Sequence, residues 1–272
     1  MYPSVHLRAA AFALIAASAL PGLAHADDPA AIADRFRISV GGFFLNYESR
    51  GRLDSDALGI GDEIRLETDL DLDHNQPRVR LDGYWRFAER HRVDFAYFDL
   101  DRRASNRITA DIHFGDQIFR IDETINSRFR NRIIQARYNY SLIRRDSVEW
   151  LIGAGISAIK IQLDLELEGS GDKAEGEEIG VPIPVISSRL TWRVQPRAHL
   201  NLDLSAIKGS IGDIEGRFID AAVTLDYFVT KNFGFGFGYN IVDAEYIEDK
   251  TLRRLQTNMT YDGLRLYGTF AF

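Results

Sequence analysis

Asp and His side chains recur at close spacing in two polar stretches of this 272-residue chain. Asp69, Asp71 and Asp73 alternate with leucines, and Asp111 stands two positions before His113. A carboxylate beside an imidazole can help it to act as a general base that activates water. The first chemistry to weigh is therefore hydrolysis. Both patterns are short, and Asp-x-Asp is expected by chance in so acidic a stretch.

Other chemistry has weaker support in the sequence. The acidic stretches offer carboxylate oxygens, which Ca²⁺ and Mg²⁺ prefer, but their spacing fits no defined loop motif. There is no phosphate loop, dinucleotide fingerprint, zinc pattern or His-x-Ser pair. The net charge of −7 argues against a nucleic-acid partner. We therefore expect a protein that is not an enzyme, with no catalytic residues, no cofactor and no metal ligands.

Residues 1–26 have the features of a secretory signal peptide. Arg8 precedes an apolar run at 9–20, and Ala24-His25-Ala26 offers a small-x-small cleavage site. The run is shorter than the roughly 20 apolar residues of a membrane-spanning helix. We expect export and a mature domain at 27–272, without disulfides because the chain has no cysteine.

The mature chain is dominated by a period of two. Leu200, Leu202 and Leu204 share one face of a run, opposite Asn201 and Asp203. Such alternation is typical of strands with one apolar face. Ten runs show it, at 35–48, 76–88, 91–104, 126–143, 147–167, 182–194, 197–208, 216–229, 232–246 and 253–272. Each exceeds the roughly 9–11 residues with which a tilted strand crosses a bilayer.

Two of these runs are irregular. The pattern blurs after Tyr97 in 91–104 and changes phase near Ala158 in 147–167. A β-bulge, or a strand leaving the bilayer, explains either irregularity.

Short and long connections alternate along the chain. The short ones are 89–90, 144–146, 195–196 and 230–231, and the long ones are 49–75, 105–125, 168–181, 209–215 and 247–252. This alternation is typical of outer-membrane barrels, with short periplasmic turns and longer outer loops. We predict a single all-β domain, an antiparallel transmembrane β-barrel of ten strands, with eight as the alternative.

Three tryptophans are expected at one depth of this barrel. Trp85, Trp150 and Trp192 lie near short turns and on the apolar phase of their runs. Rings with a polar handle favour the headgroup level of a membrane. They therefore predict an inner aromatic girdle.

The opposite phase places charged side chains inside the barrel. The predicted lumen network consists of Arg78, Arg80, Asp82, Arg86, Arg137, Arg189, Arg193, Asp203, Asp220 and Asp226. Barrels of about eight strands are filled by side chains, and wide channels need about sixteen. A packed network is thus favoured over a narrow conducting path. Gly234, Gly236 and Gly238 face inward too, where they leave space or admit long arginines.

Acidic residues gather in three of the outer segments. Residues 48–75, 164–178 and 243–250 carry net charges of −6, −6 and −3. Removal of residues 1–26 takes away one cation, Arg8, and gives a mature charge of −8. The remainder of the mature chain therefore carries +7, and the acidic balance belongs to the outer loops.

The stretch 69–103 and the end at 261–272 (YDGLRLYGTFAF) resemble the small outer-membrane β-barrel proteins of Gram-negative bacteria, the opacity-protein and OmpW-like group. The resemblance implies location in the outer membrane, among its lipids and lipopolysaccharide. Phe270 and the terminal Phe272 resemble the signal that the barrel assembly machinery recognises. The outer loops are where an extracellular ligand would bind.

The expected function is non-enzymatic, in structure or surface interaction, with a largely plugged lumen and acidic extracellular loops. A narrow passive channel for small solutes is the alternative. A third hypothesis is an omptin-like protease. Omptins are ten-stranded barrels that pair an Asp–Asp couple with an Asp–His couple at the outer rim. Here Asp69–Asp71 or Asp71–Asp73 would supply the first couple and Asp111–His113 the second.

Overall fold

The computed structural model describes residues 34–53, 62–73, 75–114, 117–169, 173–175, 179–211, 214–250 and 253–272. The predicted signal peptide at 1–26 lies outside the described residues, as do parts of the acidic segments. Within the described part, no helix is long and apolar enough to cross a membrane.

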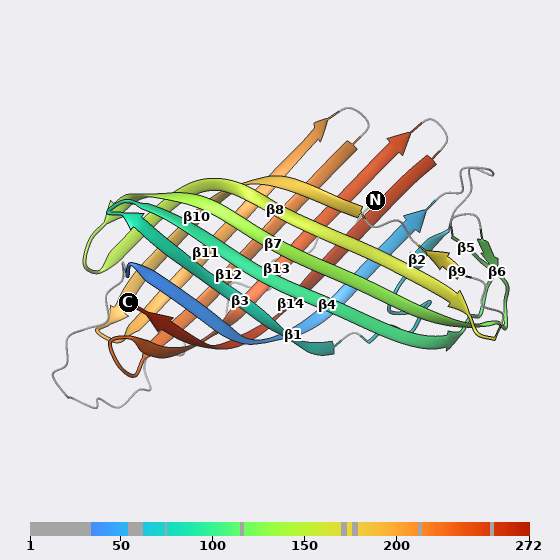
Figure 1. Cartoon of the computed structure of the whole chain (residues 1–272), viewed down its shortest axis with the longest axis horizontal. Coiled ribbons are helices and arrows are strands. Elements are labelled where there is room, and N and C mark those ends of the chain that lie inside the picture. Colours follow the sequence, from blue (N-terminus) through green and yellow to red (C-terminus); the bar gives the residue numbers. More distant parts are fainter. Residues whose placement is uncertain are drawn as a thin grey trace.

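Ten long strands form the wall of a closed barrel (Figure 1). They are β1 (Phe36–Leu53), β3 (Asn75–Ala88), β4 (His91–Arg107), β7 (Thr124–Arg144), β8 (Val148–Leu167), β10 (Ile179–Gln195), β11 (Ala198–Ile211), β12 (Ile214–Phe228), β13 (Phe233–Lys250) and β14 (Arg253–Ala271). Each pairs antiparallel with the next, and β14 pairs with β1. The all-β fold and the ten strands are confirmed.

The two ends of the barrel differ. At one end, the turn end, successive strands are joined by 89–90, 145–147, 196–197 and 229–232, and three register shifts lie beside these turns, at Arg86/Ala88, Ser141/Ile143 and Arg193/Gln195. Four short strands gather at the other end, the loop end: β2 (Glu63–Arg65), β5 (Ile112–Phe114), β6 (Gln117–Phe119) and β9 (Lys173–Glu175) (Figure 1).

The strands run further at the loop end than the sequence predicted. The expected loops at 209–215 and 247–252 are mostly strand, because β11 and β12 pair out to Ile211↔Ile214 and β13 and β14 to Lys250↔Arg253. β4 likewise continues to Arg107. The wall therefore extends well past the part that carries apolar residues outward.

The outward face carries an apolar band. Exposed large side chains of this band include Val40 and Phe44 on β1, and Phe235 and Phe237 on β13. Exposed apolar area of this extent marks a surface that another apolar phase covers. Together with strands that exceed bilayer length, it is the surface of a membrane barrel.

Both irregular runs mark the upper edge of this band. On β8, Ile156 faces outward and Ser157 inward, whereas further toward the loop end Lys160 faces outward and Ile159 inward. Register with β7 stays unbroken from Ile125↔Leu167 to Ser141↔Leu151. The phase change near Ala158 is therefore not a bulge. The strand leaves the apolar band there, and the apolar side chains move to the lumen.

Candidate functional site

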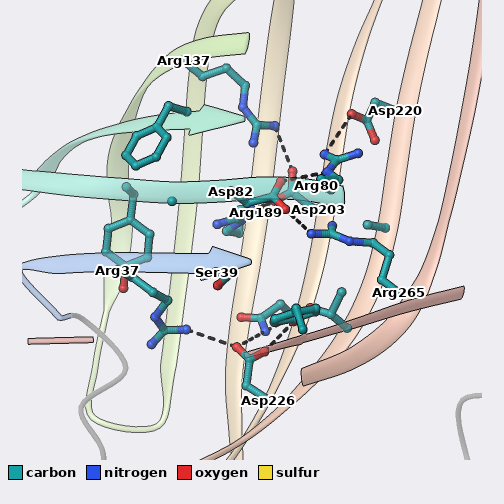
Figure 2. Close-up of a pocket in the computed structure, with 17 residues that line it drawn as sticks. Arg37, Ser39, Arg80, Asp82, Arg137, Arg189, Asp203, Asp220, Asp226 and Arg265 are labelled. Atoms are coloured by element: carbon teal, nitrogen blue, oxygen red, sulfur yellow. Dashed lines mark hydrogen bonds and ion pairs between the residues drawn. The ribbon is translucent and has the colours of Figure 1, made fainter. Parts of the chain in front are cut away.

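The lumen near the turn end contains a network of paired charges. Asp203 on β11 accepts from Arg137 on β7, at 3.0 Å, and also from Arg189 on β10. Arg189 reaches Asp94 on β4 as well, at 3.5 Å between Nη1 and Oδ2. Figure 2 shows Arg137, Arg189 and Asp203 pointing toward one another from different strands of the wall. They link β4, β7, β10 and β11, strands that lie within one half of the wall.

A second group of this network surrounds Arg80. Its Nε donates to Asp82 and its Nη1 to Asn240 on β13, both at 3.0 Å, while Asp220 lies 3.9 Å from Nη2 (Figure 2). Arg265 on β14 donates to the other oxygen of Asp82. Carboxylates here are shared between arginines, so that buried charges are compensated as their burial requires.

A third group closes the turn end. Nη2 of Arg86 donates to both oxygens of Glu149 at 2.8 Å, and the hydroxyl of Ser141 donates to Oε1 at 2.6 Å. Glu149 is fully buried. On the other side, Asp226 accepts from Arg37 at 3.1 Å and from the hydroxyl of Tyr267 at 2.5 Å.

All ten predicted network residues belong to described strands, but two lie apart from these groups. Arg78 is half-buried further up β3, and its Nη2 donates to the backbone carbonyl of Asp101 at 2.6 Å. Arg193 lies opposite His199 near the turn end of β10. Glu149 and Arg265 also take part in the network and face inward, as the polar phase of their strands predicts, whereas Arg37 was not predicted.

At one of the three inward glycines, the space that the missing side chain leaves is occupied by a tyrosine. A Cβ on Gly236 would overlap the phenol ring of Tyr267, and a Cβ on Gly234 or Gly238 would meet the backbone of β12. Gly236 therefore leaves the space in which Tyr267 reaches Asp226.

Little space remains inside this network. Among the described residues, its cavity has a volume of about 70 Å³ and is lined by Arg37, Arg80, Asp82, Asp203 and their neighbours. That is room for a few water molecules, since each needs about 10–15 Å³ of such volume. Ordinary solutes are larger.

The lumen toward the loop end is filled by apolar side chains instead. Members on the wall strands include Phe43, Leu45, Tyr47, Phe98, Leu100, Phe129, Ile133, Leu163, Val242, Met259 and Tyr261. The rings of Phe43, Phe98 and Tyr261 contact one another at 5.8–6.1 Å between centroids. We call this the apolar layer. It lies above the charged network, and the sequence did not predict it.

The segment 62–73 closes the apolar layer. Its Leu66, Leu70 and Leu72 are at most 1% exposed and belong to the same cluster. Glu67 holds the segment by a 2.7 Å ion pair to the fully buried Arg102 of β4, whose guanidinium lies over Tyr47 at 4.6 Å. The segment is acidic as predicted, but its leucines turn into the barrel.

The structure changes the predicted Asp–His pairing. Nδ1 of His113 lies 2.9 Å from Asp62, whereas Asp111 accepts from the backbone N–H of Ile121 at 2.7 Å. Partial burial raises the pKa of Asp62, but hydrogen bonds from the backbone N–H and ring of His113 outweigh it, and the net pKa lies below the ordinary carboxyl range. His74 lies outside the described residues. Within them, no three His, Asp or Glu side chains gather as a metal site.

The predicted girdle residues lie on the outward face near the turn end. Trp85, Trp150 and Trp192 are 54%, 39% and 50% exposed. Phe270 and Phe272 also face outward, and the ring of Phe272 lies 5.2 Å from that of Phe36, so that the end of the chain pairs with its first strand.

Comparison with known proteins gives a likeness in fold. No family model matches the chain, and no curated protein matches it in sequence. Among solved structures, the outer-membrane protease OmpT of Escherichia coli is similar, with a TM-score of 0.51, 10% identity, 89% of this chain covered and 98% of the other. OprG of Pseudomonas aeruginosa aligns at 0.37, with 10% identity over 90% and 99% of the two chains. Ail of Yersinia pestis aligns at 0.28, with 12% identity over 86% and 99%.

The protein is thus an antiparallel β-barrel of the outer-membrane type. The closed ten-stranded wall and the outward apolar band define this class, and the likeness to OmpT in fold agrees with it.

Proposed function

We propose that the chain is a non-enzymatic outer-membrane barrel with a plugged lumen, whose role is structural or lies in interaction at the cell surface. The observation that carries this proposal is the filling of the lumen in two layers. Charged pairs around Asp203 and Asp82 fill the turn end, and the apolar layer with Leu70 and Leu72 fills the loop end. A solute would have to disrupt both.

The passive-channel alternative requires a continuous aqueous path. The described lumen offers a cavity of about 70 Å³ on the polar side, beneath an apolar layer that excludes water and ions. This disfavours the channel.

Purified protein reconstituted in a planar bilayer tests the proposal. We expect no discrete conductance steps from protein that is folded, as shown by circular dichroism and by faster migration on gels before boiling. Steps from folded wild-type protein would overturn the plugged lumen, and a protein found soluble in the periplasm would overturn the membrane barrel itself.

One observation favours a protease as a second candidate. The ring of His113 pairs with Asp62 at the loop end, in a barrel that is similar in fold to a protease. The same Asp62 carboxylate also accepts from the backbone N–H of His113 at 2.9 Å, so the pair equally serves as a clip between segments. Cleavage of a peptide library that His113→Ala abolishes would support this candidate. Absence of cleavage, or cleavage unchanged in that variant, removes it.

A further inference from the structure

The outward face carries two pairs of cations directly above the apolar band. Arg132 on β7 stands opposite Lys160 on β8, and Lys208 on β11 stands opposite Arg217 on β12. All four side chains are exposed. Like charges directly opposite each other in a sheet are destabilising, because their Cβ atoms are only about 5 Å apart.

Both pairs lie at the same level of the barrel. The residue pair below Arg132 and Lys160 is Ile134↔Ala158, the last of the apolar band on those strands. Below Lys208 and Arg217 the corresponding pair is Ala206↔Ile219. The first charge above the band is therefore a cation on β7, β8, β11 and β12.

The opposite side of the barrel has the reverse sign at this level. The first outward charge above the band is Asp99 on β4, Asp243 on β13 and Asp262 on β14. Asp99 lies 3.6 Å from Arg132, and Asp243 and Glu245 lie 2.8 and 3.7 Å from Arg217. We call the four cations, Arg132, Lys160, Lys208 and Arg217, the basic arc. Acids flank this arc on both sides. Exposed ion pairs of this kind stabilise little and leave an arginine able to bind a further anion.

We propose that this basic arc binds the phosphorylated headgroup of an anionic membrane lipid, with its acyl chains lying on the apolar band below. The proposal rests on the membrane placement given above. A phosphate between two opposed cations would turn a repulsive contact into charge-assisted hydrogen bonds. The centres of the two pairs lie three strand spacings apart across the sheet, about 14 Å, and about four residues apart along the strands, roughly 13 Å. The arc thus offers two phosphate positions.

A lipid fits this surface better than a soluble anion does. The cations stand at the border between an apolar face and a polar one, which is where the phosphate of a lipid lies and where its chains continue. A depression of about 710 Å³ adjoins the first pair toward the loop end, with Arg103, Arg128 and Arg130 among its lining residues beside Asp164 and Glu166. It gives a polar headgroup room above its phosphates.

The test uses folded full-length barrel in neutral detergent, titrated with diphosphoryl lipid A and followed by native mass spectrometry. The variant Lys160→Gln/Lys208→Gln removes one cation from each pair and keeps both arginine ion pairs. We expect its Kd to rise at least about tenfold, since each cation beside anionic headgroups contributes roughly a fivefold effect.

Three controls make the result decisive. Arg50→Gln/Arg107→Gln removes the same charge from exposed sites outside the arc and should leave the Kd unchanged within about twofold. Lys160→Arg/Lys208→Arg should retain binding. Dephosphorylated lipid and inorganic pyrophosphate should each bind at least about tenfold more weakly than the diphosphoryl lipid.

An equal Kd in the glutamine variant and its control would overturn the proposal. Equal binding of the dephosphorylated lipid would also overturn it. Competition by pyrophosphate as strong as competition by the lipid would overturn it too, because the site would then be one for soluble anions. Insertion of the same proteins into phosphatidylcholine vesicles, read by gel migration before boiling, tests the membrane placement separately.

Discussion

At the scale of single residues, Glu149 has the least access to water of the carboxylates that the structure describes. Arg86 and Ser141 supply its hydrogen bonds, and Arg92 lies 3.8 Å from its other oxygen. Removing the main partner of a buried charge costs about 3–5 kcal/mol. We expect Arg86→Ala to lower the free energy of unfolding by that amount, measured by urea titration of the reconstituted barrel.

The nearby exposed pair Arg144–Glu89 is the matched control. Its atoms are 3.2 Å apart, but Glu89 is largely in water. Arg144→Ala should therefore change stability by about 1 kcal/mol or less. Equal losses in both variants would mean that burial does not govern the network.

Gly236 makes a second test at this scale. A methyl group there would overlap the ring of Tyr267, so Gly236→Ala should destabilise the barrel by about 1–3 kcal/mol, as overpacking does. Gly209→Ala, where a Cβ would meet no atom within 4 Å, should change the urea midpoint little. In a Tyr267→Ala background, Gly236→Ala should lose most of its effect, because the added methyl group then has no ring to overlap.

At the scale of elements, the segment 62–73 acts as a plug held by its leucines. Leu70 is fully buried in the apolar layer, and replacing it with Ser leaves a cavity and an unsatisfied hydroxyl, which costs about 2–5 kcal/mol locally. We expect Leu70→Ser/Leu72→Ser to make this segment sensitive to protease while the barrel remains folded on gels. Glu63→Ser/Thr68→Ser, at exposed positions of the same segment, should stay as resistant as wild type.

The contact between this segment and β5 should depend on pH. The pKa of Asp62 is lowered by His113, so the contact stabilises the fold above the ordinary carboxyl range, about 3.9. The stabilisation is lost progressively as pH falls from the ordinary carboxyl pKa through the lowered pKa of Asp62. The protection factor of the His113 amide, whose N–H donates to Asp62, should thus hold at pH 4 and fall in stronger acid. In Asp62→Ala, this protection should be low throughout.

The same elements show what the sequence could predict. The ten strands were predictable because alternation continues along their whole length, whichever face is apolar. The apolar layer was not, because at Ala158 the polar and apolar faces exchange places without a break in register. From sequence alone, that exchange looks like an irregularity. The burial of Leu70 and Leu72 was not predictable for a related reason. The two leucines alternate with aspartates, and this pattern predicts an acidic loop.

The lumen network was likewise predictable only in part: the sequence indicates which side chains face inward, but not which of them pair. Arg80, Asp82 and Asp203 were predictable from their phase alone. Which arginine meets which carboxylate across the barrel was not, since Arg137 and Asp203 are brought together only by closure of the sheet. The pairing of His113 with Asp62, 51 positions away, likewise depends on how two outer segments meet.

At the scale of the whole molecule, the barrel has two parts of opposite polarity that share one continuous wall. Near the turn end it is apolar outside and charged inside, and near the loop end it is charged outside and apolar inside. The inversion coincides with the upper edge of the outward apolar band, where Lys160 and Arg217 face outward. A membrane covers the first exterior, and water surrounds the second. The interior of each part therefore has the polarity that its exterior lacks.

Because the two fillings lie in series along the barrel axis, removing one should leave the lumen closed. The variant Arg137→Ser/Asp203→Ser/Arg189→Ser empties the middle of the charged network without leaving the charge of Asp203 behind. It should form folded barrels that give no conductance steps in a planar bilayer. Leu66→Ser/Leu70→Ser/Leu72→Ser should also be silent, since the charged pairs below remain. The six substitutions together should still be silent, because the rings of Phe43, Phe98 and Tyr261 and the Arg86–Glu149 pair remain in the lumen. Conductance from the network variant alone would mean that the apolar layer is no barrier, and the seal would then belong to the charged network by itself.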